Sequence, residues 1–235
     1  MTLRILLYIL IGASLTACSS HLEVILPSSG KIALQETNVE KEKIAQFIQP
    51  YKDSVKLVMS EVIAQSDLSL ESGRPNSLLG NWTTDALFVH ETAHIRLSEP
   101  VFCLLTNGGL RSSIGKGTVS RGDIFRLMPF DNEVVWVRLP MSSLAKIESY
   151  LIQSGGEPIS NASMHQGKLS INGLNDRSTH FWVITSDYLA NGGDQMSFFQ
   201  DAVERQNKKV LLREVFIQAC IKQGTLVTSN HKRID

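Results

Sequence analysis

The sequence predicts a single α+β domain in which a mixed β-sheet is flanked by helices. Three observations support this prediction. Segments with helical spacing of apolar residues alternate with short apolar runs typical of strands, and no internal repeat is present. The turn-rich segment "PISNASMHQGKLSING" is typical of a β-hairpin and implies some antiparallel pairing. The chain has 235 residues, 43% of them hydrophobic, which is enough to bury one core.

The first half of the domain is expected to contain two helices and a strand. Apolar residues recur at steps of three and four from Asn38 to about Gln65, which predicts an amphipathic helix. Pro50 is expected to kink or split it, because proline removes a backbone donor. After a loop containing "SGRPNS", the segment "LLGNWTTDALFVHE" predicts a second helix. "EPVFCLLTN" predicts a buried strand that stops at a glycine pair.

The second half is expected to add two strands, three helices and the hairpin. "RGDIFRLMPF" predicts a short helix leading into a turn, and "NEVVWVRLP" predicts a strand. "SSLAKIESYLIQSGG" begins with serines that can cap amides and ends in glycines, as a helix does. The strand "HFWVIT" follows the hairpin, and "VLLREVFIQACIKQ" predicts a closing helix. We expect the domain to span residues 38–224 and residues 225–235 to be a frayed tail.

The charge balance gives no support to nucleic-acid binding. Lys and Arg number 23 and Asp and Glu number 23, with no basic block, although a local cationic pocket is still allowed. The domain contains Cys103 and Cys220 but no C-x-x-C pair, which excludes a cysteine-based zinc site. Either a disulfide between these two cysteines or two buried free thiols agrees with the sequence.

The N-terminal segment "MTLRILLYILIGASLTAC" is typical of a signal peptide, because its apolar run is too short for a confident membrane span. Its last four residues resemble a bacterial lipobox. On that pattern, residues 1–18 form a lipoprotein signal peptide that ends at Cys18. This cysteine is expected to carry the lipid chains, which include palmitate. An ordinary secretory signal with a chance cysteine is the alternative. Residues 19–37 are expected to be a tether. Ser19 is not an acidic retention signal, so anchoring to the outer membrane of the bacterial envelope is favoured.

Two of the turns beside the predicted strands carry side chains suited to binding. In "TNGGLR", the glycines allow close approach of the backbone. Arg111, just beyond them, can aim a planar charged fork at a phosphate or carboxylate; a plain turn with a solvated arginine is the alternative. In "MPFDN", Phe130 offers a stacking face and Asn132 offers paired donor and acceptor groups. A place in the core is the alternative for Phe130.

A third turn, "SDYLANGGDQM", combines an aromatic, two glycines and an acid. In this order the three turns resemble the C-terminal, substrate-binding domain of the 5'-nucleotidase family, over about residues 43–200. The resemblance implies that two rings sandwich a nucleobase, and these match Phe130 and Tyr188. It also implies that Asn132 contacts the base, that Asp194 contacts the ribose hydroxyls, and that Arg111 faces phosphate or sugar.

The sequence departs from the family pattern at several positions. The family turn usually reads Asn-x-Gly-Gly-Ile/Leu-Arg, but Thr106 stands at the first position and Asn107 at the variable one. A ligand contact from Asn107 therefore stays open. Arg74, before "LLGNW", is a candidate for a second arginine on the phosphate side. Tyr188 stands where many members have Phe, which keeps the ring and adds a hydroxyl.

Enzymes of this family also carry an N-terminal metallophosphoesterase domain whose Asp, His and Asn side chains hold two metal ions. The sequence contains no Asp-x-His or Asn-His-Asp segment, so we expect no catalytic residue and no cofactor in this chain. The resemblance implies the half of a 5'-nucleotidase that binds a nucleoside or nucleoside monophosphate for nucleotide catabolism. It would be inactive alone and would need a separate metallophosphoesterase chain with divalent metal ions. The alternative is a nucleotide-scavenging or sensing lipoprotein without a catalytic partner.

A weaker alternative comes from "VHETAHI", which fits the H-E-x-x-H motif of zinc metalloproteases. On a helix, His90 and His94 would share one face and could bind zinc, with Glu91 as the general base. No third ligand follows at a metzincin-like spacing, and the helix must end before the strand that opens at Pro100. The missing third ligand and the short room for the helix both count against a zinc protease.

Overall fold

The structure is a computed structural model that describes residues 38–235. The predicted signal peptide, its lipidated Cys18 and the tether of residues 19–37 lie outside the described residues. The chain divides into two units, Met1–Phe47 and Ile48–Asp235, and the β-sheets of the described residues lie in the second.

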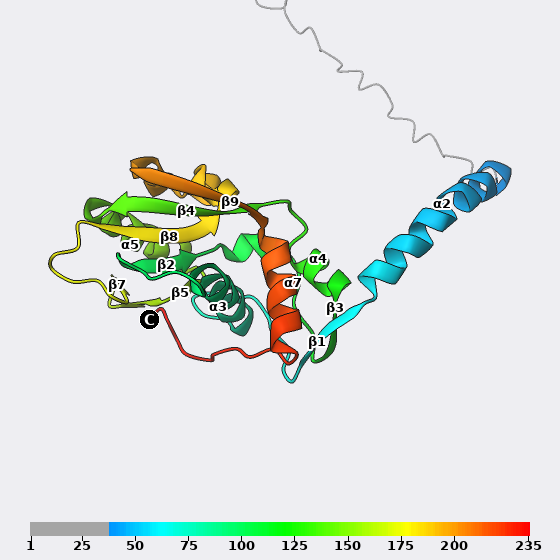
Figure 1. The fold of residues 1–235 in the computed structure, drawn as a ribbon, viewed down its shortest axis with the longest axis horizontal. Coiled ribbons are helices and arrows are strands. Elements are labelled where there is room, and N and C mark those ends of the chain that lie inside the picture. Colours follow the sequence, from blue (N-terminus) through cyan, green and yellow to red (C-terminus); the bar gives the residue numbers. More distant parts are fainter. Residues whose placement is uncertain (1–37) are drawn as a thin grey trace, which may run out of the picture. The chain divides into compact units, whose positions relative to one another are not determined.

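A five-stranded sheet with the order β5-β2-β8-β4-β9 forms the centre of the second unit (Figure 1). Strand β2 pairs with β8 in parallel, and the other neighbours pair antiparallel. The predicted mixed sheet is therefore confirmed. The strands have these bounds: β2 Val101–Leu104, β4 Glu133–Pro140, β5 Ile159–Ser160, β8 His180–Ser186 and β9 Glu204–Leu211.

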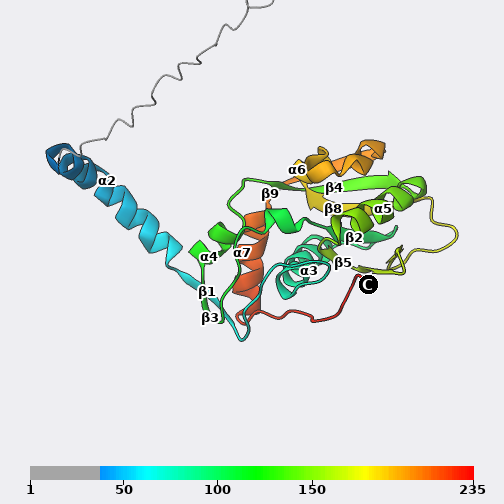
Figure 2. The same cartoon turned by 180° about the vertical axis from the view of Figure 1, so that it is seen from behind.

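Helices cover both faces of this sheet (Figures 1 and 2). One core lies between one face and the helices α3 (Leu78–Thr92) and α7 (Leu212–Gln223), where Trp82 and Phe216 pack with ring centroids 5.8 Å apart. The other core lies against α5 (Leu144–Ser154). Successive side chains of a strand point to opposite faces, so alternate residues of β2 and β4 enter different cores. Because both faces are covered, these strands read as continuous apolar runs.

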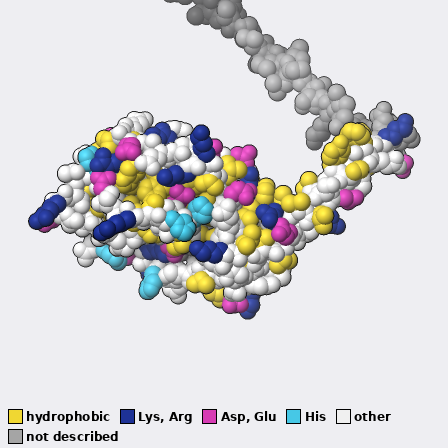
Figure 3. All heavy atoms as spheres, viewed as in Figure 1, with side chains coloured by type: hydrophobic (Ala, Val, Ile, Leu, Met, Phe, Trp, Pro, Cys, Tyr) yellow, Lys and Arg dark blue, Asp and Glu magenta, His cyan; other side chains and the backbone are white. Residues whose placement is uncertain are grey.

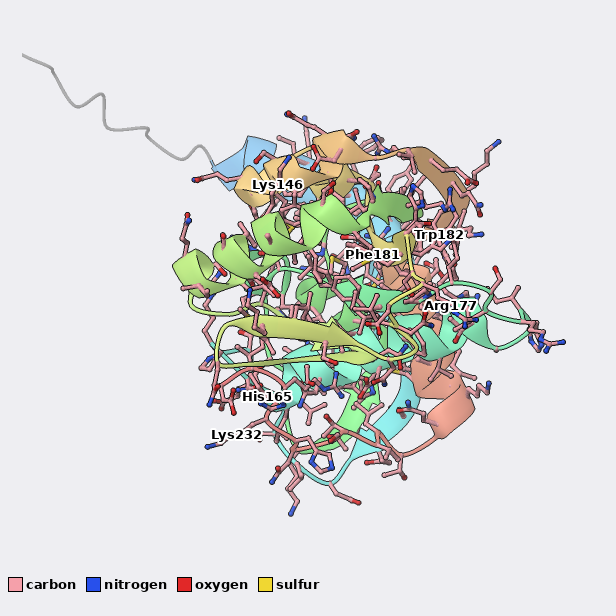
Figure 4. The ribbon with its side chains drawn as sticks, turned by 90° about the vertical axis from the view of Figure 1, so that its left-hand side faces the viewer. Lys146, His165, Arg177, Phe181, Trp182 and Lys232 are labelled. Carbon is pink, nitrogen blue, oxygen red and sulfur yellow. The ribbon has the colours of Figure 1, made fainter. Side chains whose placement is uncertain are left out.

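Shorter elements complete the second unit. Strand β1 (Val62–Ser66) pairs antiparallel with β3 (Gly117–Ser120), and helix α4 (Arg121–Leu127) follows directly with a capping box. The predicted hairpin is confirmed as β6 (Ala162–His165) and β7 (Lys168–Ile171). Figure 4 looks onto this end of the molecule, with Lys146 on α5 and His165 on the hairpin. On the face in Figure 3, basic and acidic side chains are interspersed.

The first predicted helix ends earlier than expected. Helix α2 (Asn38–Met59) continues through Pro50, so the predicted split does not occur; the proline removes one backbone donor without ending the helix. The extension to Gln65 is wrong, because Ile63 and Ala64 are buried in β1. Among the described residues, four strands were not predicted: β1, β3, β5 and β9. Strand β9 is polar and exposed at the sheet edge, and so lacks an apolar alternation.

Of the two caps predicted for α5, the one at its C-terminus is confirmed and the one at its N-terminus is wrong. Gly155 ends the helix with a left-handed φ of 76°, as its glycine predicts. The predicted serine cap is wrong: Ser143 makes no capping hydrogen bond, and its hydroxyl donates to Asp201 at 2.8 Å.

Cys103 and Cys220 are both free and buried, so the alternative of two buried free thiols is the right one and they form no disulfide. In the described part of the chain, no helix has the length and apolarity needed to cross a membrane.

The last residues of the chain are held against the domain, so the expectation of a frayed tail is wrong. The side chain of Asn76 accepts hydrogen bonds from the backbone amides of Arg233 and Ile234, at 2.6 and 3.0 Å. Arg233 also donates to Asp85 at 2.6 Å, and Ile234 is only 8% exposed. The sequence has no periodic signal there, because these contacts are made by single side chains and by backbone groups.

Candidate functional site

A cavity of about 370 Å³ lies at one end of the central strands, where the three glycine-rich or polar turns meet. Strands β2 and β8 are parallel, and their carboxyl ends lie beside the cavity. Strand β4 is antiparallel to β8, so β4 begins there. The turn after β2, the turn before β4 and the turn after β8 are therefore brought together. Five of the seven predicted binding residues line this cavity: Arg111, Phe130, Asn132, Tyr188 and Asp194.

The first turn is a short 3-10 helix, Asn107–Gly109, directly after the buried end of β2. Thr106 caps it: its hydroxyl accepts from the backbone N–H of Gly108 at 3.2 Å. Threonine thus caps the turn from the position where the family turn has asparagine. Arg111 is exposed and donates through Nη1 to the Gly108 carbonyl at 3.1 Å. Its remaining guanidinium donors have no hydrogen bond to any of the described residues.

The second turn carries an exposed ring. Phe130 is 45% exposed, so the core alternative for this residue is wrong. Arg213, on α7 and only 8% exposed, holds the turn. It donates to the backbone carbonyls of Met128 and Phe130, both at 3.4 Å, and to the carboxylate of Asp131 at 2.6 Å. The backbone carbonyl of Asn132 accepts from Leu212 at 2.9 Å, which also ties this turn to α7.

The third turn begins with helix α6 (Asp187–Ala190), capped by Ser186. The Asp187 carboxylate accepts from its neighbour, the Tyr188 amide, at 2.8 Å and from the Glu133 amide at 3.1 Å. It thereby joins the third turn to the start of β4, next to Asn132. Tyr188 is 49% exposed, and its hydroxyl donates to the Asp194 carboxylate at 3.0 Å.

A second cavity, of about 520 Å³, shares Thr106, Gly108 and Asp194 with the first. Its other lining residues include Arg74 and Tyr150. Burial, followed by the negative charges of Glu157 and Asp194, raises the pKa of Tyr150 to about 12. The carboxylate of Asp194 thus stands where the two cavities meet.

The two remaining predicted binding residues, Arg74 and Asn107, do not line the first cavity. Both contact Glu157, which is 1% exposed. Arg74 forms an ion pair with its carboxylate, and Asn107 donates to it through the backbone amide at 2.7 Å and the side chain at 3.1 Å. Glu157 therefore holds the first turn in place. Arg74 lines the second cavity while it keeps this partner.

Three residues that position the turns were not predicted from the sequence: Glu157, Asp187 and Arg213. Asp187 lies inside the third motif, so its place before the aromatic was a usable signal. Glu157 and Arg213 act on partners 50 and 83 residues away. No local pattern marks such a pairing.

The residues of the H-E-x-x-H motif are engaged with other partners. The ring nitrogens of His90 lie 3.1 Å from Glu91 and 3.1 Å from Gln218, and the other oxygen of Glu91 accepts from Trp136 at 2.7 Å. Helix α3 ends at Thr92, so His94 stands beyond it. Within residues 38–235, no group of three or more His, Cys, Asp or Glu side chains could hold a metal ion. The geometry does not favour a zinc protease.

Comparisons with known proteins agree with the resemblance of the three turns. Residues 58–147 match the family model described as "5'-nucleotidase, C-terminal domain". The chain is 23% identical to a 5'-nucleotidase of Vibrio parahaemolyticus over 180 residues, which is 71% of this chain and 31% of that protein. It is 27% identical to an apyrase of Tabanus yao over 206 residues, 73% of this chain and 37% of that one.

A solved structure shares the fold. The crystal structure of a 5'-nucleotidase precursor from Thermus thermophilus superimposes with a TM-score of 0.66, at 23% identity, covering 85% of this chain and 43% of that one. The chain thus spans less than half the length of each of these relatives.

Proposed function

Because this chain contains the C-terminal domain of the 5'-nucleotidase family, we propose that it binds a nucleoside or nucleoside monophosphate in the first cavity. The observation that carries the proposal is the convergence of Phe130, Tyr188 and Asn132 from turns far apart in the sequence. The base stacks between the two rings, and the Asn132 amide meets its edge with paired donor and acceptor groups.

The exposure of the two rings supports a stacking role. Phe130 and Tyr188 are 45% and 49% exposed, although the fold buries most of its other aromatic side chains. Complete burial of a large apolar side chain contributes about 1.5–3 kcal/mol, so covering a ring that is already half buried contributes about half of that. A nucleobase offers such a surface, because every base has a π-face.

Polar groups around the rings suit the rest of a nucleotide. Asp194 presents its carboxylate at the junction of the cavities, where it can accept hydrogen bonds from sugar hydroxyls. Arg111 lines the same cavity with unused guanidinium donors, which match the geometry of a phosphate. Arg74 is a weaker phosphate candidate, because the buried carboxylate of Glu157 already neutralises it.

We propose that hydrolysis is carried out by a metallophosphoesterase domain on a separate chain. The groups in the first cavity bind and orient a nucleotide, and none of the described residues forms a cluster that fits a metal ion. The chain covers 31% of the length of the matched Vibrio 5'-nucleotidase. Together the two chains would serve nucleotide catabolism.

The proposal extends to location. The lipobox "LTAC" and the signal-like run before it support export and lipid attachment at Cys18, with anchoring in the bacterial outer membrane favoured. The membrane contact would then be made by the lipid.

A phosphate-release assay with AMP and divalent metal ions tests the division of labour. The purified protein alone should release no phosphate, and addition of a metallophosphoesterase encoded beside it should give metal-dependent release. Loss of Phe130 and Tyr188 should lower the affinity of the combined system for AMP. Turnover by the isolated chain would refute the proposal. Nucleotide binding with no turnover in any combination would favour a scavenging or sensing protein.

A further inference from the structure

We infer that the hydroxyl of Tyr188 is a specificity element: it orients the Asp194 carboxylate so that the cavity prefers ribose over deoxyribose. This inference rests on the proposed nucleoside site. It concerns a group that a phenylalanine at the same position would lack. Tyr188 acts here as a positioning residue, because its hydroxyl acts through Asp194.

The hydroxyl bridges two atoms of one residue. Tyr188 Oη donates to Asp194 Oδ1 at 3.0 Å, and it accepts from the backbone N–H of Asp194 at 3.4 Å. The first bond is charge-assisted and is the stronger of the two. Together they fix both the backbone and the carboxylate of Asp194 relative to the ring.

The turn leaves this pair little freedom. Asp194 has a left-handed backbone with φ 50° and ψ 30°, a conformation that few L-residues adopt, although Asp tolerates it. Gly193 lies against the ring: a Cβ added there would be 2.5 Å from Cε1 and Cζ of Tyr188. The glycine therefore allows the ring to sit close enough for its hydroxyl to reach Asp194.

The bond to Tyr188 decides which acceptor faces the ligand. Oδ1 is occupied, whereas Oδ2 makes no hydrogen bond to any described residue and lies 3.5 Å from where a Cβ of Gly108 would be. Oδ2 thus points toward the first turn, at the junction of the two cavities. A carboxylate has about four lone-pair sites, so Oδ2 and the remaining site on Oδ1 can accept from a cis-diol.

Removal of the hydroxyl should cost ribose more than deoxyribose. In Tyr188→Phe the ring stays, so stacking of the base is kept. The carboxylate then rotates freely, and a diol must order it on binding. A deoxyribose makes fewer hydrogen bonds to the Asp194 carboxylate, so a deoxynucleoside should lose less affinity.

The test is calorimetric titration of the full chain with adenosine, guanosine, cytidine and uridine, and then with the 2'-deoxy and 3'-deoxy forms of the tightest binder. Tyr188→Phe should weaken the ribonucleoside about five- to tenfold, on the scale of one ordinary intramolecular hydrogen bond. Binding of the deoxynucleosides should change less than about twofold, so the preference for ribose falls. Asp194→Asn should reduce the same preference, and Tyr51→Phe, on α2, should leave it unchanged.

The outcomes distinguish failure of the hydroxyl's role from failure of the proposed nucleoside site. If the wild-type protein binds nucleosides but Tyr188→Phe keeps the wild-type preference for ribose, the role of the hydroxyl is refuted and the proposed function stands. If the wild-type protein binds none of the four nucleosides and none of their 5'-monophosphates, the proposed function fails and the inference fails with it. Circular dichroism of each variant shows whether a loss comes from unfolding.

Discussion

The guanidinium of Arg213, buried in helix α7, donates to the backbone carbonyl of Phe130, at the tip of a turn 83 residues earlier in the chain. The same side chain lies over the ring of Phe125, 4.3 Å from its centroid. One arginine thus connects the closing helix to the turn that exposes a stacking ring. This arrangement allows Phe130 to stay exposed without leaving its turn unsupported.

Replacement of this arginine should affect both stability and binding. Arg213→Met removes the donors to Met128, Phe130 and Asp131, and we expect the free energy of unfolding to fall by about 1–3 kcal/mol. Nucleoside affinity should fall further than stability explains, because the Phe130 turn loses its anchor. Urea unfolding and calorimetric titration measure the two effects. Arg126→Met, at a side chain that is 66% exposed, is the matched control and should change stability by less than about 0.5 kcal/mol.

The two rings should contribute similarly to base binding. Phe130→Ala and Tyr188→Ala should each weaken deoxynucleoside binding by about 1–3 kcal/mol, the range for stacking of a base on an aromatic side chain. Phe130→Tyr keeps the ring and should stay near wild type. Val203→Ala, at an exposed apolar residue outside the cavity, is the control. Wild-type affinity in both alanine variants would contradict the stacking proposal.

The contribution of Arg111 should depend on the phosphate. Arg111→Ala should weaken a nucleoside monophosphate by about 1–2 kcal/mol, because a charge-assisted pair is lost at a solvent-exposed site. The matching nucleoside should change little. Arg111→Lys keeps the charge without the planar fork and should fall between. Titrations that give equal losses for both ligands would place Arg111 away from the phosphate.

Stability should fall in alkali through Tyr150. Its pKa is raised to about 12, mainly by burial and next by the charges of Glu157 and Asp194, whereas an unfolded tyrosine titrates near about 10. The neutral phenol is favoured in the folded state, so this stabilisation is complete below about pH 10 and is lost progressively between about pH 10 and 12. Urea unfolding at pH 8 and pH 11 should show a smaller alkaline loss for Tyr150→Phe than for wild type. An equal loss in both proteins would assign the effect to other groups.

Membrane attachment should depend on Cys18. Cys18→Ala should move the protein from the membrane fraction to the soluble fraction, because the lipid chains would supply the anchor. Cell fractionation followed by immunoblotting measures this change, and Ser20→Ala should behave as wild type. If Cys18→Ala stays with the membranes, the lipobox interpretation is wrong.

The sequence by itself determined the kinds of element in most of the domain. The strands β2, β4 and β8 were predicted from short, nearly continuous apolar runs, and the helix α5 from the residues at its two ends. The helices α3 and α7 were predicted as well. It also indicated five of the residues that line the first cavity, through the resemblance of three turns to a known family. Polar segments gave no such signal, so β9 and the ordered tail were missed.

Only the tertiary structure decided that the three turns share one cavity. Strand β8 lies between β2 and β4, parallel to the first and antiparallel to the second. This order brings the three turns together at the same end of the strands. The supports of the turns were decided there too. Glu157 reaches Asn107, and Arg213 reaches Phe130, across long stretches of chain. Such partners are set by proximity in the folded chain, and short-range sequence patterns do not encode that proximity.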